Sequence, residues 1–152
     1  MKNSLIYSVL SIVMMILVTS CTTNDGDIGF LGGHWRLDAI EIDGTNDDDY
    51  SGNITWAFQN RIIEISVLGP NHSRANFFGT FTHQDNTLVI DYTHSSDDIP
   101  PGNGEYRLPV ELHLTAPVIV TFQIAENTRR SMTLITTNDN GQNLKFSLSK
   151  IY

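Results

Sequence analysis

The sharpest signal for chemistry in this sequence is an acidic segment, Asp47-Asp48-Asp49-Tyr50-Ser51-Gly52. Four of its residues match positions 1, 3, 5 and 6 of the calcium loop of an EF-hand, namely Asp47, Asp49, Ser51 and Gly52. The twelfth position is Phe58, where that loop needs a bidentate glutamate, and the flanking residues alternate like strands. We therefore predict a solvated acidic loop and no metal ion, with a calcium site of another kind in residues 45–52 left open.

The other candidates for catalysis or metal binding have no partner at the required spacing. The histidines are His34, His72, His83, His94 and His113, and the sequence shows no close zinc-type pair among them. A hairpin around residues 84–87 would bring His83 near His94, but a zinc site needs a third protein ligand. Asp97 and Asp98 are paired carboxylates, yet adjacent loop residues point in different directions and no nucleophile lies nearby. The sequence also lacks a nucleophile elbow, a phosphate loop and a dinucleotide fingerprint, so we predict no enzyme and no cofactor.

The chain begins like an exported protein that is held to a membrane. Lys2 precedes an uncharged, largely apolar run of 14 residues, which is shorter than the roughly 20 that a membrane-spanning helix needs. Val18-Thr19-Ser20-Cys21 resembles the lipobox of bacterial lipoproteins. That resemblance implies cleavage before Cys21 and acylation of its thiol, and two or three acyl chains hold a protein durably on a bilayer. We expect residues 1–20 to be a signal peptide, residues 21–31 a lipidated tether, and the outer membrane to be favoured over the inner one.

Composition excludes several classes of partner and site. Without residues 1–20 the chain has 132 residues, enough for a single domain with one core. Lys2 is the only charge lost, so 8 basic and 17 acidic residues give a net charge of −9. Nucleic acid and anionic headgroups repel such a body, so we expect no nucleic-acid partner and membrane attachment through the lipid. Cys21 is the only cysteine, and its acylation would exclude disulfides and thiolate sites.

From His34 onward apolar and polar residues alternate, which is the period of half-buried strands. The pattern covers eight segments, at about residues 34–42, 54–59, 62–67, 76–82, 88–92, 118–124, 132–134 and 144–149. Tight turn sequences join most of them, whereas residues 43–53 and 93–117 are long connections, with a turn or short strand at 110–114. We predict an all-β, eight-stranded antiparallel up-and-down barrel over residues 32–152 rather than a sandwich, because closure removes exposed strand edges.

Gly33-His34-Trp35 opens the first segment and resembles the Gly-x-Trp signature of lipocalins. Together with the lipobox and the eight strands, it makes the chain similar to the small lipocalin-like lipoproteins of Gram-negative bacteria. The resemblance implies that Trp35 plugs the closed end of a cup for a small apolar molecule. The sequence departs from the family in lacking a Thr-Asp-Tyr motif and a C-terminal helix. The arginine that often stacks on this tryptophan in the family is not evident either, since the only cations near the end of the chain are Lys145 and Lys150.

The predicted inward positions carry large aromatic side chains. They are Trp56, Phe58, Phe77, Phe81, Tyr92, Phe122 and Phe146. An eight-stranded barrel has room for packed side chains or for one small ligand, which leaves two hypotheses. In the first, these residues line a pocket for a small apolar or amphipathic ligand. In the second, they fill the core, and the loops 43–53 and 93–117 contact another envelope protein or a glycan.

Overall fold

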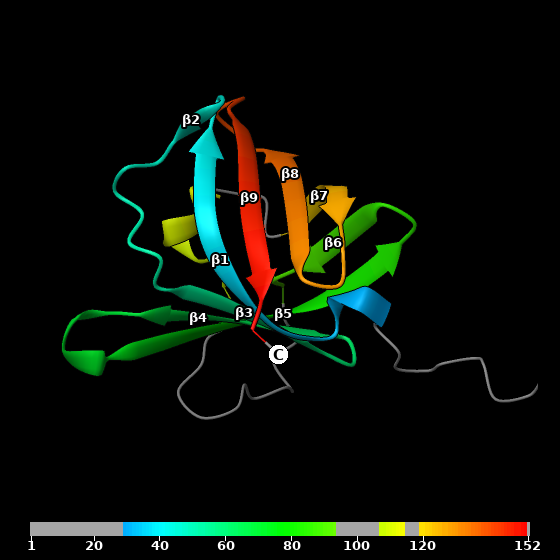
Figure 1. Ribbon diagram of the computed structural model, residues 1–152, viewed down its shortest axis with the longest axis horizontal. Coiled ribbons are helices and arrows are strands. Elements are labelled where there is room, and N and C mark those ends of the chain that lie inside the picture. Colours follow the sequence, from blue (N-terminus) through cyan, green and yellow to red (C-terminus); the bar gives the residue numbers. More distant parts are fainter. Residues whose placement is uncertain (1–28, 94–106, 115–118, 152) are drawn as a thin grey trace, which may run out of the picture.

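The computed structural model describes residues 29–93, 107–114 and 119–151. Its strands are Gly33–Ile42 (β1), Thr45–Asn46 (β2), Ile54–Gln59 (β3), Ile62–Leu68 (β4), Arg74–Gln84 (β5), Thr87–Asp91 (β6), Ile119–Asn127 (β7), Ser131–Thr137 (β8) and Asn143–Lys150 (β9). Its 3-10 turns are Gly29–Leu31 (η1), Pro70–His72 (η2) and Val110–Leu112 (η3). The eight long strands match the eight predicted segments, and the model is all-β (Figure 1).

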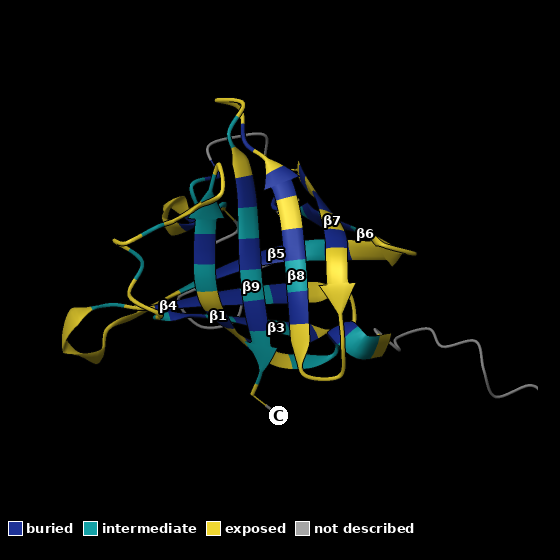
Figure 2. Ribbon diagram, turned by 45° about the horizontal axis from the view of Figure 1, so that its top comes forward, coloured by how far each residue is buried: buried dark blue, intermediate teal, exposed yellow. Residues whose placement is uncertain are grey.

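The sheet closes on itself. From β3 to β9 each strand pairs antiparallel with the next, β1 pairs with β3, and β1 also pairs with β9 from Trp35↔Lys150 to Ile42↔Leu144. The predicted eight-stranded antiparallel barrel is therefore confirmed. Its strands are strongly tilted, so that β1, β9 and β8 cross in front of β3 and β5 (Figure 2). β5 makes one corner, because its first half pairs with β4 and its second half with β6.

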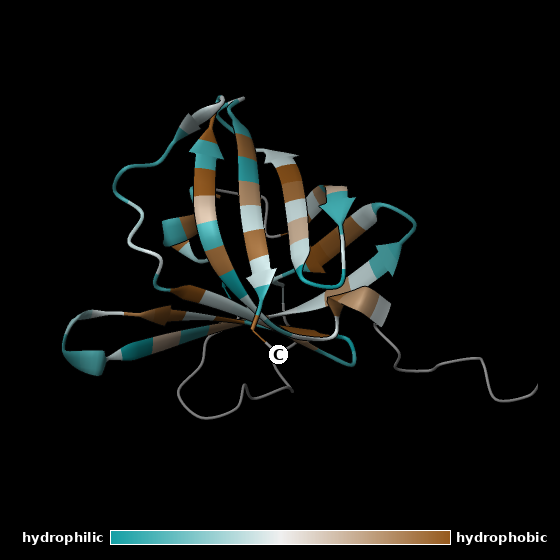
Figure 3. Cartoon of the chain, in the orientation of Figure 1, coloured by the Kyte–Doolittle hydropathy of each residue, from teal (hydrophilic) through white to brown (hydrophobic). Residues whose placement is uncertain are grey.

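Alternation along the strands separates the core from solvent. In β8, for example, Met132, Leu134 and Thr136 are buried while Ser131, Ile135 and Thr137 are exposed. Figures 2 and 3 show the same banding of burial and hydropathy along β1, β8 and β9. One apolar cluster results, and it draws buried side chains from every long strand. Burial of apolar surface is the main free-energy gain of such a fold.

The turns follow from residues that accept a left-handed backbone. Asn60 (φ 54°) and Asp85 (φ 52°) lie at the β3–β4 and β5–β6 turns, as expected for short antiparallel connections. Asp43 (φ 51°) and Gly44 (φ 82°) form a two-residue turn between β1 and β2, with Ile42 opposite Thr45. The predicted long connection 43–53 thus begins with an Asp-Gly hairpin and the short strand β2. Among the described residues, no helix has the length and apolar character needed to cross a bilayer.

Candidate functional site

The seven predicted inward aromatics all lie in the buried core. Their most exposed member, Phe81, has only 5% of its surface accessible. The Trp56 ring lies 6.0 Å from that of Phe122 and 6.1 Å from that of Phe146, and the Phe58 and Phe81 rings meet edge to face at 5.1 Å. These centroid distances are those of favourable aromatic pairs. Side chains therefore fill the part of the barrel around Trp56.

Two polar atoms of this apolar interior have no hydrogen-bond partner among the described residues. They are the indole Nε1 of Trp56 and the hydroxyl oxygen of Tyr92. Both side chains are buried, with 0% and 1% of their surface exposed. Burial in apolar surroundings raises the pKa of the Tyr92 phenol, so the hydroxyl stays protonated and able to donate. A buried donor without a partner costs about 1–3 kcal/mol, so each is a site that an acceptor would stabilise.

Gly79 lies against the Tyr92 ring. A Cβ placed on Gly79 would lie 3.3 Å from Cδ1 of Tyr92 and 2.9 Å from the carbonyl oxygen of Asp91. Real Cβ atoms essentially never lie that close to a backbone atom, so a side chain at residue 79 would force the Asp91 backbone or the Tyr92 ring to shift. Gly79 therefore allows the close packing of β5 against the Asp91 backbone and the edge of the Tyr92 ring.

Trp35 lies at one end of the barrel, which we call the N-terminal end because the described chain begins there. Its indole Nε1 donates to the carbonyl oxygen of Leu31 at 2.7 Å, and both residues are fully buried. Lys150 places Nζ 5.0 Å from the centre of the Trp35 ring and donates to the carbonyl oxygen of Phe30 at 3.2 Å. Lys150 thus stacks on Trp35 in the way expected of an arginine in the lipocalin resemblance. It can do so because the pairing of β1 with β9 places Lys150 opposite Trp35.

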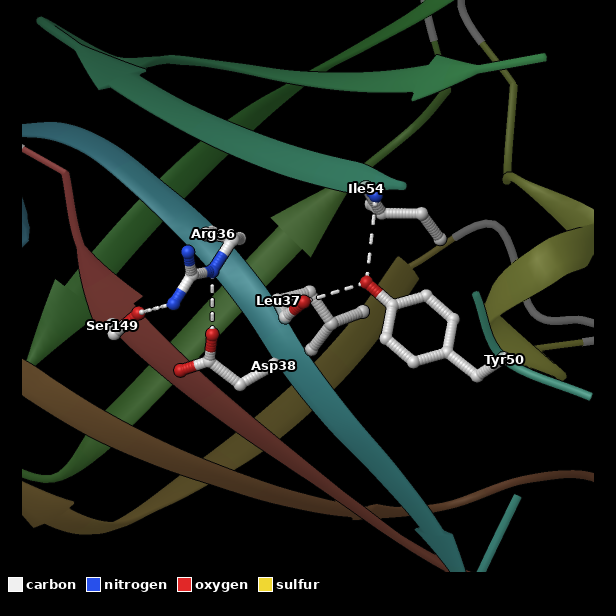
Figure 4. Close-up of polar contacts among 6 residues, drawn as sticks. All are labelled: Arg36, Leu37, Asp38, Tyr50, Ile54 and Ser149. Atoms are coloured by element: carbon white, nitrogen blue, oxygen red, sulfur yellow. Dashed lines mark hydrogen bonds and ion pairs between the residues drawn. The ribbon is translucent and has the colours of Figure 1, made fainter. Parts of the chain in front are cut away.

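The opposite end, called the loop end below, is covered by the connection between β1 and β3. The Tyr50 hydroxyl donates to the carbonyl oxygen of Leu37 at 2.6 Å and accepts from the backbone N–H of Ile54 at 3.4 Å (Figure 4). Partial burial raises the pKa of Tyr50 to about 12. On the outer face of β1, the Arg36 guanidinium forms an ion pair with Asp38 at 2.7 Å and donates a hydrogen bond to the Ser149 hydroxyl (Figure 4). Tyr50 therefore ties the acidic loop to the barrel wall.

A second connection meets the acidic loop at the loop end. His113 Nε2 lies 2.8 Å from Asp47 Oδ2, and the Asn138 side-chain amide donates to the His113 carbonyl oxygen at 3.2 Å. Leu112 and Leu114, on either side of His113, are buried in the core. The contact joins residues 66 positions apart. The acidic loop is therefore solvated at Asp48 and Asp49, which are exposed, whereas Asp47 is held by the partly exposed His113.

Residues 110–114 were predicted to form a turn or a short strand, and they form the 3-10 turn η3 followed by His113 in a left-handed conformation (φ 55°). Arg107 sits nearby in the chain with its guanidinium carbon 4.7 Å from the centre of the inward-facing Phe77 ring. No sequence pattern signalled the His113 pairing or the Arg107 stacking, because both depend on how a long connection folds back.

Metal and acid–base chemistry gain no support from the described chain. Within residues 29–93, 107–114 and 119–151, no three His, Cys, Asp or Glu side chains gather as metal ligands. His83 contacts the Asp85 carbonyl oxygen at 2.7 Å and packs edge to face on Phe30. Its suggested partner His94, the pair Asp97 and Asp98, and the predicted anchor Cys21 all lie outside the described residues.

Four hollows of the described residues have volumes between about 140 and 450 Å³. None of them is lined by any of the seven inward aromatics. They lie against outward-facing strand positions or, in one case, at the N-terminal end of the barrel. The interior site is therefore defined by buried donors and aromatic walls, not by a described cavity.

A family model described as a lipocalin-like domain matches residues 15–147. The chain belongs to this lipocalin-like family. A lipocalin-like protein from Bacteroides uniformis has a similar structure, with a TM-score of 0.58 and 19% sequence identity, over 81% of this chain and 100% of that chain. An uncharacterised protein from Bacteroides eggerthii gives a TM-score of 0.53 and 21% identity, over 79% of this chain and 98% of that chain. At these identities the likeness concerns the fold, and no curated protein matches the chain.

Proposed function

We propose that this lipocalin-like chain is a lipid-anchored protein of the bacterial envelope whose barrel binds a small, mostly apolar ligand that carries a hydrogen-bond acceptor. The observation that carries the ligand proposal is the pair of buried donors without partners, Trp56 Nε1 and the Tyr92 hydroxyl. An apolar interior with a few convergent polar groups is typical of small-molecule sites. A carbonyl, ether or ester oxygen of the ligand would accept from these donors, while the aromatic rings contact its apolar part.

The experiment for the ligand proposal compares two Tyr→Phe substitutions. Tyr92→Phe removes a hydroxyl that has no partner, so the ligand-free protein should unfold with an unchanged or about 1 kcal/mol higher free energy. Ligand retention should fall about tenfold, because one hydrogen bond to the ligand is lost. Tyr50→Phe is the matched control: it removes a hydroxyl that does have a partner, so stability should fall. The fraction of protein that carries ligand at equilibrium should be kept, because a looser loop end speeds binding and release alike.

Retention is measured by native mass spectrometry of the Cys21→Ser protein, before and after solvent extraction. A reproducible extra mass that extraction removes, and that Tyr92→Phe weakens, supports the proposal. A clean ligand-free mass that persists after incubation with a lipid extract contradicts it. That result would favour the second hypothesis, a filled barrel that contacts envelope proteins or glycans through its loops. The aromatic contacts around Trp56 are the observation on its side.

The anchor is a separate part of the proposal and rests on the Val18-Thr19-Ser20-Cys21 sequence. Acylation of Cys21 would hold the domain at the membrane surface, and we favour the outer membrane. Cys21→Ser should move the protein from the membrane fraction to the soluble fraction. Membrane fractionation that is the same for Cys21→Ser and the unchanged chain would contradict the anchor.

A further inference from the structure

Three basic side chains form a hollow at the N-terminal end of the barrel. Arg129, Arg130 and Lys150, with Ile151, line a volume of about 450 Å³. The chain beyond residue 20 carries a net charge of −9 and only 8 basic residues. Three of those 8 line this hollow. We infer that it docks the anionic phosphate headgroups of the membrane that carries the lipid anchor. The inference rests on the proposed acylation of Cys21.

The hollow is built on fixed backbone. Thr128 Oγ1 accepts from the backbone N–H groups of Arg130 and Ser131 at 3.2 and 2.9 Å, and it lies 2.7 Å from the Ser131 hydroxyl. The Lys150 backbone N–H donates to the Arg130 carbonyl oxygen at 2.8 Å, which joins the β7–β8 turn to the end of β9. These bonds hold the three cationic residues side by side.

The cationic groups of the hollow are available to an anion. Among the described residues, the guanidinium groups of Arg129 and Arg130 form no ion pair. Within the described part of the chain, the Lys150 ammonium donates to a neutral carbonyl oxygen, stacks on an indole and forms no ion pair, so its charge is positioned but not neutralised. Among the described residues, no acidic side chain lines the hollow. Clustered basic groups near a membrane surface are the usual recognition element for anionic headgroups.

Charge is distributed unequally between the two ends of the barrel. The loop end carries the acidic residues of the β1–β2–β3 connection, of η3 and of the β8–β9 turn, which are Asp43, Asp47, Asp48, Asp49, Glu111 and Asp139. An anionic surface repels that end and attracts the hollow, so the two effects favour the same orientation. The acidic body as a whole is repelled, which is why the lipid anchor must supply the proximity.

The tether is short enough for the hollow to reach the bilayer. Gly29, the first described residue, is eight residues from Cys21. Eight residues span at most about 28 Å even when fully extended. Lys150 contacts Phe30 directly, so the hollow lies beside the point where the tether joins the barrel. Figure 1 shows η1 and the C-terminal end on the same side of the molecule, away from β2.

The test measures the orientation of the lipidated protein on vesicles. A fluorophore is placed on a new cysteine, either by Asn127→Cys near the hollow or by Asn140→Cys at the loop end, both exposed positions. Acylated Cys21 is the chain's only other cysteine, so labelling is selective. Quenching by headgroup spin-labelled lipid is compared on phosphatidylcholine vesicles and on an equimolar mixture with phosphatidylglycerol. We expect the Asn127→Cys label to be quenched more on the anionic vesicles, and the difference to shrink with added salt.

Charge-removing variants decide whether the hollow is responsible. Arg129→Gln with Arg130→Gln should lower the ratio of docked to undocked protein about 30-fold, since each basic group contributes roughly fivefold at an anionic surface. Arg36→Gln with Arg74→Gln removes the same charge from a hollow on the barrel wall and should leave the orientation unchanged. Equal quenching at both labels, or an equal effect of the two double variants, overturns the inference. Release of the unchanged protein from vesicles by buffer alone would instead show that the anchor proposal has failed, and the docking inference with it.

If the labels are quenched equally, inorganic phosphate at constant ionic strength is the second probe. A rise in melting temperature that needs Arg129 and Arg130 would then assign the hollow to a soluble anion and would overturn membrane docking.

Discussion

At the N-terminal end of the barrel, Trp35 and Leu31 are fully buried, and the contacts that join them are local in sequence. At the loop end, two long connections meet through Tyr50, Asp47 and His113, and the His113 side chain is 40% exposed. The first closure rests on apolar burial, the second on polar contacts near water. Exposed ion pairs contribute little to stability, so the loop end is the place where a ligand would enter at small free-energy cost.

The largest expected effect is at the N-terminal end. Trp35→Ala should lower the free energy of unfolding by about 3–5 kcal/mol, because it removes a fully buried indole and leaves the Leu31 carbonyl oxygen unpaired. Urea unfolding measures it, and Ile119→Ala on the exposed face of β7 is a control that should cost under about 1 kcal/mol. A Trp35→Ala loss as small as the control's would remove the contrast between the ends.

Tyr50→Phe tests the loop end directly. The substitution should lower the free energy of unfolding by about 0.5–1.5 kcal/mol, the net contribution of one hydrogen bond. The acceptor, the Leu37 carbonyl oxygen, becomes solvated when the acidic loop loosens. Amide exchange should accelerate in residues 47–53 and stay unchanged in β8. Acceleration throughout the barrel would mean that the acidic loop is part of the core and not a separate cover.

The Asp47–His113 pair should have a smaller effect on stability than Tyr50. Asp47→Asn and His113→Gln should each cost under about 1 kcal/mol, because the pair is partly exposed. A double-mutant cycle isolates the coupling, and the release rate of a bound apolar dye reports opening of the loop end. The two variants should speed release alike; no change in release would place the entrance elsewhere.

The smallest effect is confined to high pH. The pKa of Tyr50 is about 12 in the fold, against an ordinary value of 10.0, mainly because burial disfavours the phenolate. Below pH 10.0 the phenol is neutral in both states, and its contribution is complete. As pH rises from 10.0 to about 12, the unfolded chain ionises first and the free energy of unfolding falls. Tyr50→Phe should make that fall shallower, and an identical pH slope in the variant would contradict the burial of this phenol.

The barrel could be predicted from the sequence because its strands alternate cleanly and its turns use residues such as Asn60 and Asp85. The burial of all seven aromatics follows from the same period of two. The cover of the loop end could not be predicted, because the Asp47–His113 contact depends on how two long connections fold. The Asp43-Gly44 hairpin, in contrast, could have been predicted from the sequence, because an Asp-Gly dipeptide is a strong signal for a two-residue turn.

Lys150 was missed for another reason. Its stacking on Trp35 requires the register between the first and last strands, and periodicity within one strand carries no information on that register. The basic hollow was missed likewise: Arg129 and Arg130 are adjacent in sequence, but Lys150 joins them only once β8 and β9 have paired.

The pairing of β1 with β9 also has a kinetic consequence. Because Trp35 lies opposite Lys150, the hydrogen-bond ladder between β1 and β9 forms only after the last strand of the chain is available. Contacts of such high sequence separation slow folding. If the chain is exported as we propose, its earlier strands would have to stay unaggregated until the C-terminus emerges. A chain that stops before Asn143 would lack β9 and leave both β1 and β8 as open sheet edges. Open edges pair with other chains, so the loss of these few C-terminal residues would promote aggregation.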